Sequence, residues 1–205
     1  MTGWWIAALA AAATSSPAPT HDWHGLALGA TDATGIDGWA TAHGWTCATA
    51  PSPRRTTVHH DCDHPDPSAI GEQALRGRLD QVLLARLDDG PLHHVSTDRV
   101  FAVPADASAT YAAALARLTA TFGPPVRTMA APATFDGPLI RATTTWTFSD
   151  LTVDLTVMRV GTGPIHLSER WDVPGVEARA ITRPGTAAIH GGGTPTPAKN
   201  PHLAD

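Results

Sequence analysis

The chain contains almost no lysine. Lys199 is the single lysine among 14 basic residues, and the formal net charge is -5 at pH 7. A protein that binds nucleic acid needs a concentrated set of lysine and arginine side chains to neutralise phosphates. The sequence has no such set, so we predict no nucleic-acid partner.

Apolar runs long enough to span a bilayer are also missing. The N-terminal apolar stretch, residues 4–13, is too short to cross and is typical of the apolar region of a secretory signal. We predict a signal peptide over residues 1–18, a periplasmic or secreted location, and no membrane attachment after cleavage, because no cysteine follows the stretch to carry a lipid. A misassigned start codon or a buried N-terminal helix is the alternative.

Cysteine is scarce, with Cys47 and Cys62 the two in the sequence. In an oxidising compartment an even pair this close in sequence is most simply a disulfide. The chain-entropy model gives such a cross-link about 3 kcal/mol of stability. We therefore predict a Cys47–Cys62 disulfide.

A metal site is the alternative use of this region, with His59, His60, Asp61 and His64 as candidate ligands. Side chains alternate along a strand, so His60 shares a face with Cys62, whereas His59 and Asp61 point the other way. The familiar zinc-binding spacings do not occur in the sequence. We predict no cofactor and no metal, and keep these four residues as the alternative.

Catalytic motifs are absent as well. No serine lies on a Gly-x-Ser-x-Gly elbow. His93 and His166 each follow a Gly-Pro turn in two similar segments, and a residue that recurs in both is more simply explained by the repeat than by one active site. We predict no catalytic residue. A secreted hydrolase, or a metal-binding protein that uses the His/Asp-rich strand, is the alternative.

What the sequence does contain is a repeat. Residues 82–93 read VLLARLDDGPLH and residues 155–166 read LTVMRVGTGPIH, an ungapped match at an offset of 73 (155 minus 82). Apolar residues at alternate positions, followed by a Gly-Pro turn, indicate a β-hairpin that is used twice.

The two hairpins should have equivalent turns. We expect Gly90 and Gly163 to take the positive φ that tight turns require, a conformation open to glycine. We also expect Leu92 and Ile165 to occupy corresponding places at the start of the return strands.

Arginines recur in both hairpins. Arg86 aligns with Arg159, and Arg99 with Arg170. We expect Arg99 and Arg170 to lie on the same side of their strands. Cross-strand ion pairs at the sheet surface are the simpler explanation of these arginines, and a ligand-binding arginine is the other.

Two helices accompany the strands. Thr31 is expected to cap a helix that ends at Gly44. Asp106 or Ser108 is expected to cap a second helix, whose apolar stripe ends at Gly123. The sequence therefore predicts an α+β fold: an antiparallel sheet with two helices packed on one face, containing a repeated β-hairpin.

The domain organisation follows from these elements. We predict one α+β domain over residues 19–172, with hairpin repeats at about 26–100 and 106–172. Residues 173–205 are rich in proline and glycine and are predicted to form a flexible tail, because such a composition buries little apolar surface.

One family resemblance rests on the first half of the chain. The pattern is an entry segment, a glycine-terminated helix, two cysteines and a hairpin turn: Leu26-Ala27-Leu28-Gly29-Ala30-Thr31, Gly44-Trp45-Thr46-Cys47, Cys62 and Leu87-Asp88-Asp89-Gly90-Pro91-Leu92. It resembles the SmpA/OmlA (BamE-like) and β-lactamase inhibitor protein-like fold family. The resemblance implies a helical pair packed on an antiparallel sheet, present in tandem in the inhibitor, and proteins that bind other proteins and catalyse nothing.

The sequence thus favours an exported, non-catalytic binding or protein-interaction module whose partner the sequence does not identify. Exposed aromatic side chains often carry such contacts. Trp23, Trp39 and Trp45 lie close enough in sequence to share one binding region, and Trp39 and Trp45 are equally suited to the core.

Overall fold

The computed structural model describes residues 16–52, 57–63, 65–72, 75–129 and 135–175, and the fold is α+β. The two helices are α1 (Ala33–Ala42) and α2 (Pro104–Phe122), and η1 (Pro67–Ile70) is a 3-10 turn. The strands are β1 (Asp22–Trp23), β2 (Leu26–Ala27), β3 (Ala48–Pro51), β4 (Thr57–Asp63), β5 (Arg78–Leu87), β6 (Leu92–Phe101), β7 (Arg127–Met129), β8 (Leu139–Thr147), β9 (Thr152–Val160) and β10 (Ile165–Asp172).

Two of the predicted segments fall largely outside these residues. The described chain begins at residue 16, within the predicted signal peptide, and ends at residue 175, near the start of the predicted tail. Within it, no helix is long and apolar enough to cross a membrane.

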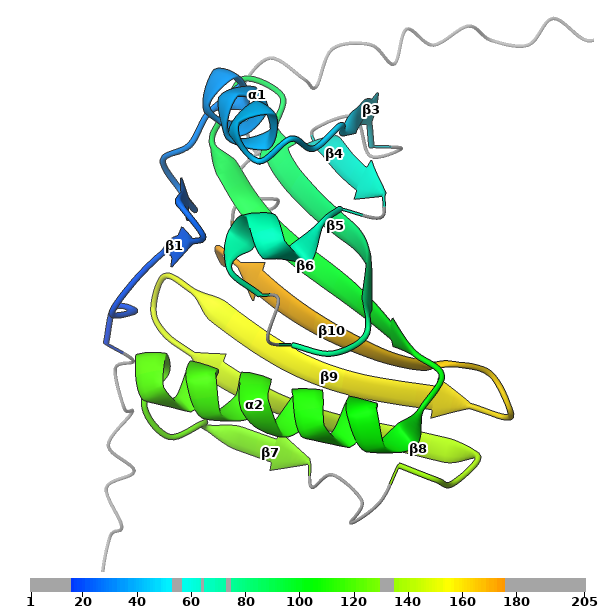
Figure 1. Ribbon diagram of the computed structural model, residues 1–205. Helices are drawn as coiled ribbons and strands as arrows, with labels where there is room; N and C mark the ends of the chain where they lie inside the picture. Colours follow the sequence, from blue (N-terminus) through cyan, green and yellow to red (C-terminus); the bar gives the residue numbers. More distant parts are fainter. Residues whose placement is uncertain (1–15, 53–56, 64, 73–74, 130–134, 176–205) are drawn as a thin grey trace, which may run out of the picture.

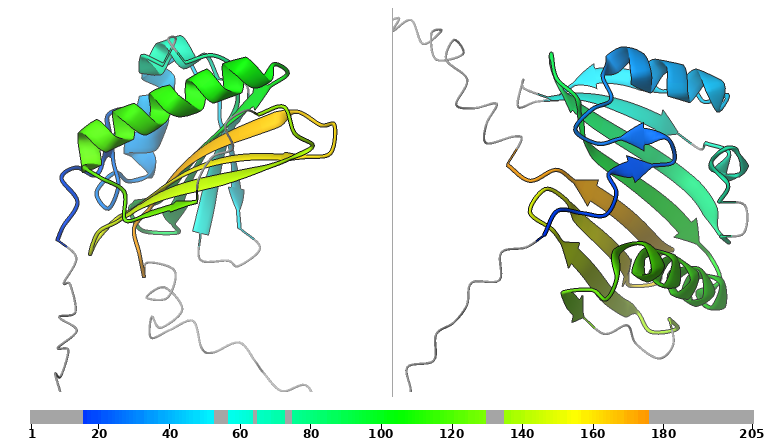
Figure 2. Two further views of the ribbon diagram at one scale, coloured as in Figure 1. Left: turned by 90° about the horizontal axis from the view of Figure 1, so that it is seen from below. Right: turned by 90° about the vertical axis from the view of Figure 1, so that its left-hand side faces the viewer.

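Eight strands form one antiparallel sheet in the order β3-β4-β5-β6-β10-β9-β8-β7, and β1 and β2 form a separate ribbon. Each half of the sheet is a four-strand meander that follows a helix in the chain: α1 precedes β3 to β6, and α2 precedes β7 to β10. The meanders meet where β6 pairs with β10. Figure 1 shows α1 at the upper end of the molecule and α2 at the lower end, and Figure 2 shows the strong twist of the sheet between them.

Alternate side chains of the sheet form much of the core, and we call the side that they occupy the inner face. One row across the inner face, read strand by strand, is Cys62, Val82, Thr97, Glu169, Leu155 and Thr144. All of these side chains are buried. The period-two pattern of the sequence therefore continues across neighbouring strands of both halves.

Helix α1 begins one residue later than predicted. Asp32 is the N-cap, and its carboxylate accepts a hydrogen bond of 2.8 Å from the backbone N–H of Gly35. Thr31 is not the cap, because its hydroxyl instead accepts from the backbone N–H of Ala27 at 3.0 Å. The helix ends just before Gly44, whose φ is 69°. Gly44 therefore provides the predicted stop.

Helix α2 begins earlier than predicted. Pro104 occupies its first turn, where the missing N–H costs nothing, and Val103 is an N-cap without a side-chain hydrogen bond. Neither Asp106 nor Ser108 is the cap, and Asp106 instead lies in the first turn. The helix ends at Gly123, as predicted, and lies across β6, β9 and β10.

The repeated segments form two antiparallel hairpins, β5–β6 and β9–β10. Leu92 and Ile165 begin the two return strands, and their side chains are 0% and 1% exposed. They occupy corresponding places, as predicted.

The predicted turn geometry is wrong. Gly90 and Gly163 do not take positive φ, whereas Gly161 does, at 68°. A Cβ atom added at Gly90 would lie 2.8 Å from the Cβ of Leu87. Close approach of the turn to Leu87, and not a left-handed backbone, therefore explains the glycine at position 90.

A β-bulge interrupts the repeat at the start of β6. Ala85 pairs with His94, but the next residue, Arg86, pairs with Leu92. His93 is therefore an extra residue in β6. Strand β10 pairs with β9 without a register shift.

The bulge changes the relation between the two return strands. Beyond it, residues correspond at an offset of 72, so Ser96 corresponds to Ser168. Arg99 is 3% exposed and lies on the inner face, whereas Arg170 is exposed on the other side. The expectation that these two arginines share a side is wrong, because the extra residue reverses the alternation.

The pairing of β6 with β10 relates the two halves by a local two-fold. Thr97 pairs with Glu169, and Glu169 is also the residue that corresponds to Thr97 in the second half at the offset of 72 (169 minus 97). The flanking pairs are Ser96 with Arg170 and Asp98 with Ser168. Exchanging each residue for its counterpart leaves this pairing unchanged, so the two-fold passes through the Thr97–Glu169 pair.

Candidate functional site

The outer face of the sheet, opposite the inner face, is predominantly polar. Its side chains include His59, Asp61, His94, Ser96, Asp98, Thr143, Thr156, His166, Ser168, Arg170 and Asp172. These side chains are half-buried or exposed. Both signs of charge are present along with neutral hydroxyl groups, as on protein surfaces that bind polar partners.

One corner of the outer face is apolar. Leu139 and Val160 pair across β8 and β9, and they are 74% and 71% exposed. Met158, on the same side of β9, is 48% exposed. Exposed apolar side chains next to one another favour contact with another molecule.

Two histidines of the outer face contact carboxylates from the neighbouring strand. His94 Nδ1 lies 2.7 Å from Asp172 Oδ1, and His166 Nδ1 lies 2.9 Å from Asp98 Oδ2. His94 also contacts a hydroxyl, because its Nε2 lies 3.2 Å from Ser96 Oγ. Hydrogen bonds therefore connect Ser96 to His94, and His94 to Asp172.

Asp172 is held in its charged form. Burial by itself would raise the pKa of this carboxyl, but hydrogen bonds from His94 and Arg170 outweigh burial and hold the pKa below its ordinary value. An ionised carboxylate can only accept hydrogen bonds. The imidazole of His94 must therefore present an N–H to Asp172.

The predicted equivalence of His93 and His166 is wrong. His93 lies in the bulge and is 5% exposed, whereas His166 lies on the outer face. At the offset of 72, the counterpart of His166 is His94.

The His/Asp-rich strand places its side chains on both sides of β4. His60 is 3% exposed and faces inward with Cys62, whereas His59 and Asp61 are half-buried on the outer face. Burial lowers the pKa of His60, although the carboxylate of Asp37 opposes this effect. His64 lies outside the described residues. Among those that are described, no group of three or more potential ligands is placed to hold a metal ion.

The predicted disulfide is confirmed. Cys47 and Cys62 are bonded, 15 residues apart, and link the segment before β3 to β4. Cys62 is fully buried. The disulfide therefore fixes the edge hairpin to the core.

The tryptophans named as possible binding residues belong to the core. Trp23, Trp39 and Trp45 are 2%, 8% and 8% exposed. The rings of Trp39 and Trp45 meet edge to face, with centroids 5.0 Å apart. They stabilise the packing of α1 and are not available to a partner.

Arg86 and Arg159 each close their own hairpin turn. Arg86 donates to the carbonyl groups of Leu87, at 2.9 Å, and Asp88. Arg159 donates to the carbonyl of Gly163 at 3.1 Å. Their roles correspond, but within the described chain neither arginine forms the predicted cross-strand ion pair.

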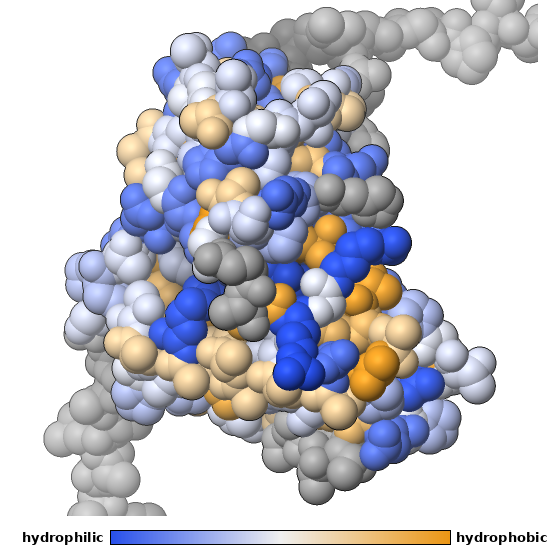
Figure 3. All heavy atoms as spheres, viewed as in Figure 1, coloured by the Kyte–Doolittle hydropathy of each residue, from blue (hydrophilic) through white to orange (hydrophobic). Residues whose placement is uncertain are grey.

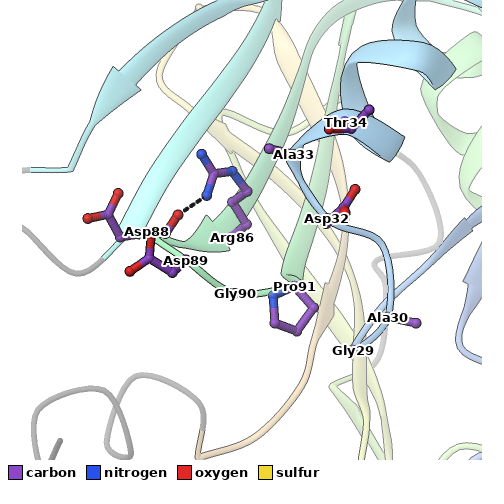
Figure 4. A pocket seen from close by; sticks show the side chains of 10 residues that line it. All are labelled: Gly29, Ala30, Asp32, Ala33, Thr34, Arg86, Asp88, Asp89, Gly90 and Pro91. Atoms are coloured by element: carbon purple, nitrogen blue, oxygen red, sulfur yellow. Dashed lines mark hydrogen bonds between the residues drawn. The ribbon is translucent and has the colours of Figure 1, made fainter.

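Arg86 also lines an open hollow between the start of α1 and the β5–β6 turn (Figure 4), with a volume of about 590 Å³. Asp88 and Asp89 lie along its rim, and Asp32 caps the helix beside it. Because the guanidinium of Arg86 is already bonded to backbone carbonyls, the hollow offers little to fix a specific ligand.

A buried ion cluster lies beneath α2 at the middle of the sheet. The Arg99 guanidinium donates to Glu72 at 2.5 Å, and these side chains are 3% and 8% exposed. Arg117, from α2, lies 3.7 Å from Glu72 and also pairs with Glu169. Hydrophilic side chains form a band just above α2 on the face seen in Figure 3.

The charged groups of this cluster stabilise one another in their ionised forms. Burial by itself would raise the pKa of Glu72, but a hydrogen bond with His24 and the charges of Arg99 and Arg117 lower it to about 2. The cluster joins α2, the segment before β5 and the central strands. We assign it a structural role, since buried charges that are paired hold elements in a fixed arrangement.

Sequence reasoning missed the contact of Ser96 with His94 and Asp172. A serine and a histidine two residues apart on a predicted strand was the available signal, because such residues share a face. Asp172 could not be placed beside them without the register of β10 on β6. Comparison of the chain with protein-family models, with characterised proteins and with solved structures gives no match.

Proposed function

We propose that this protein is a binding module that is exported to the periplasm or the medium and holds a partner protein on the outer face of its sheet. The observation that carries the proposal is the outer face itself: a continuous polar surface across two joined meanders, with an apolar corner at Leu139, Met158 and Val160. The disulfide supports export, because such bonds persist in oxidising compartments.

The size of the outer face suits a protein partner. Eight strands at about 4.8 Å spacing and central strands of about nine residues at about 3.3 Å give a face of roughly 1,000 Å². A standard protein interface covers about 800 Å² on each partner. The hollow beside α1 is lined by the start of α1 and the β5–β6 turn, and by none of the outer-face side chains named above.

The outer face is free for binding if both helices lie on the inner face, as the sequence predicts. Two contacts support this arrangement: Asp37 of α1 lies 3.7 Å from the inward-facing His60, and Tyr111 of α2 is hydrogen bonded to the inward-facing Thr144 at 3.0 Å. The tandem use of one helix and four strands also supports the proposed kinship with the BamE-like fold family, whose members bind proteins.

Differential capture tests the proposal. Three immobilised baits would be compared on the envelope fraction and medium of the native host: wild type, Thr156→Arg on the outer face, and Ala113→Arg on the exposed side of α2. We expect mass spectrometry to identify a partner recovered about equally by wild type and Ala113→Arg, and at least tenfold less by Thr156→Arg. Equal recovery by all three baits, or no recovery, would refute the use of the outer face.

A hydrolase is the second candidate, and one observation favours it: the hydrogen-bonded series Ser96, His94 and Asp172. These three residues lie on the outer face itself.

A further inference from the structure

Ser96, His94 and Asp172 come together because two strands fix them. Ser96 and His94 are two residues apart on β6 and therefore share the outer face. Asp172 of β10 is the direct cross-strand partner of His94. Directly opposed side chains on one face lie within about 5.5 Å at Cβ, close enough for the observed contacts.

The hydrogen bonds define which nitrogen of His94 is basic. The carboxylate of Asp172 accepts from Nδ1–H at 2.7 Å. In the neutral imidazole the other nitrogen, Nε2, then lacks a proton and accepts from the hydroxyl of Ser96 at 3.2 Å. This is the arrangement in which a histidine removes the proton of a serine nucleophile.

We propose that Ser96 is an activated nucleophile that is acylated by carboxylic esters with small acyl groups, with His94 as its general base. In this step Oγ of Ser96 bonds to the ester carbonyl carbon while its proton moves to Nε2 of His94. The bond from that carbon to the alcohol oxygen then breaks, and the alcohol leaves with the proton from His94. Water then attacks the carbonyl carbon of the acyl-serine while its proton moves to Nε2 of His94. The bond from that carbon to Oγ of Ser96 breaks, Ser96 takes the proton back from His94, and the carboxylic acid is released.

The surroundings of Ser96 define the class of substrate. His94 and Asp172 have side chains that are 14% and 26% exposed, so the site opens directly to solvent. Arg170 is the direct cross-strand partner of Ser96, and its guanidinium is bonded to the carboxylate of Asp172. A partly exposed serine on the sheet face, without an enclosing pocket among the described residues to hold a large acyl group, suits small, unhindered esters.

The second hairpin supplies a matched control. Ser168 and His166 are the counterparts of Ser96 and His94, and His166 contacts Asp98. In the part of the chain that is described, the structure gives no hydrogen bond between Ser168 and His166. The counterpart of Asp172 at the offset of 72 is Val100, the direct partner of His166, so the carboxylate that His166 contacts comes instead from Asp98, the partner of Ser168. Ser168 should therefore remain an ordinary serine.

Phosphonylation with a fluorophosphonate tests the proposal, because Oγ displaces fluoride from phosphorus in a reaction that needs the same proton removal. The full mature chain would be treated with the probe and the adduct located by tandem mass spectrometry. We expect the adduct on Ser96, its loss in Ser96→Ala, a rate at least tenfold lower in His94→Gln, and no change in Ser168→Ala. 4-Nitrophenyl acetate should acetylate the same serine.

Asp172 acts as a positioning residue and needs its own readout. In Asp172→Asn we expect slower labelling, because the amide no longer holds Nδ1–H of His94 and so no longer directs Nε2 at Ser96, and in Asp172→Glu we expect the labelling rate to recover. Circular dichroism would establish that each variant is folded. No adduct on Ser96 in the wild type, equal labelling of Ser96 and Ser168, or full labelling in folded His94→Gln would overturn the proposal. None of these outcomes bears on the capture of a partner protein.

Discussion

At the scale of single residues, the charge of Glu72 is the strongest electrostatic feature of the core. Its depressed pKa, about 2 against an ordinary 4.5, means that the folded state binds the proton of this carboxyl less tightly than the unfolded state does. The stabilisation is therefore complete above about pH 4.5 and is lost as the pH falls towards 2. The shift corresponds to roughly 3 kcal/mol.

Glu72→Gln should lower the free energy of unfolding by roughly 3 kcal/mol at pH 7, because Arg99 then lies buried without its counter-charge. The difference in free energy of unfolding between wild type and variant should narrow as the pH falls from 4.5 to 2. Urea unfolding followed by tryptophan fluorescence would measure both effects. Asp136→Asn, at an exposed carboxylate, is the control. A difference in free energy of unfolding that does not change with pH would contradict the depressed pKa of Glu72.

The disulfide makes a second contribution at this scale. Replacing both Cys47 and Cys62 by alanine should lower the free energy of unfolding by about 3 kcal/mol, since the unfolded chain regains the freedom that the cross-link removes. Urea unfolding of the oxidised wild type, the reduced wild type and the double variant measures this. Reduced wild type should match the double variant to within about 1 kcal/mol, and equal stability of all three forms would refute the prediction.

Single residues differ in how far the sequence alone predicts them. The Cys47–Cys62 pair is predictable because two cysteines leave one pairing. The contact of His94 with Asp172 is not, because these residues are 78 positions apart and meet through the pairing register of β6 on β10, which no local pattern specifies.

At the scale of elements, the hairpins were predictable because alternating apolar residues and a turn are local signals. The bulge leaves one trace in the sequence, the fall of the repeat offset from 73 at Leu92 and Ile165 to 72 at Ser96 and Ser168, but that fall does not identify His93 as the extra residue. Strand β7 was missed because it has three residues, all exposed. The start of α2 was placed too late because Pro104 begins the helix without a side-chain cap.

The two turn glycines should respond differently to substitution. In Gly90→Ala the new Cβ lies 2.8 Å from Leu87 Cβ, so the turn must shift, and we expect a loss of roughly 1 to 3 kcal/mol. In Gly163→Ala the nearest atom is 3.6 Å away and φ is not positive, so the change should stay within about 0.5 kcal/mol. Thermal or urea unfolding measures both. Equal losses of unfolding free energy in the two variants would show that the two turns are equally crowded around the glycine, and would contradict the prediction.

At the scale of the whole molecule, the repeat is larger than the sequence shows. The ungapped match covers one hairpin, whereas the structure repeats a helix and four strands. The change of offset from 73 to 72 hides part of the relation, and the inner-face residues of the two return strands have diverged. Arg99 corresponds at this offset to Trp171, and both are buried.

The joining of the halves produces one continuous outer face, and the central claim is that this face binds a protein. Neither meander alone provides the roughly 800 Å² of a standard interface, because four strands cover about half of the estimated area. Binding should therefore depend on residues of both halves around the β6–β10 junction.

Photocrosslinking in the native host tests this claim most directly. A photoreactive amino acid would replace Ser168 at the junction, Thr156 beside it, or Ala113 on the exposed side of α2. We predict a crosslinked product of one defined mass from positions 168 and 156 and none from position 113. Crosslinks from position 113 alone, or no product from either outer-face position, would contradict the account.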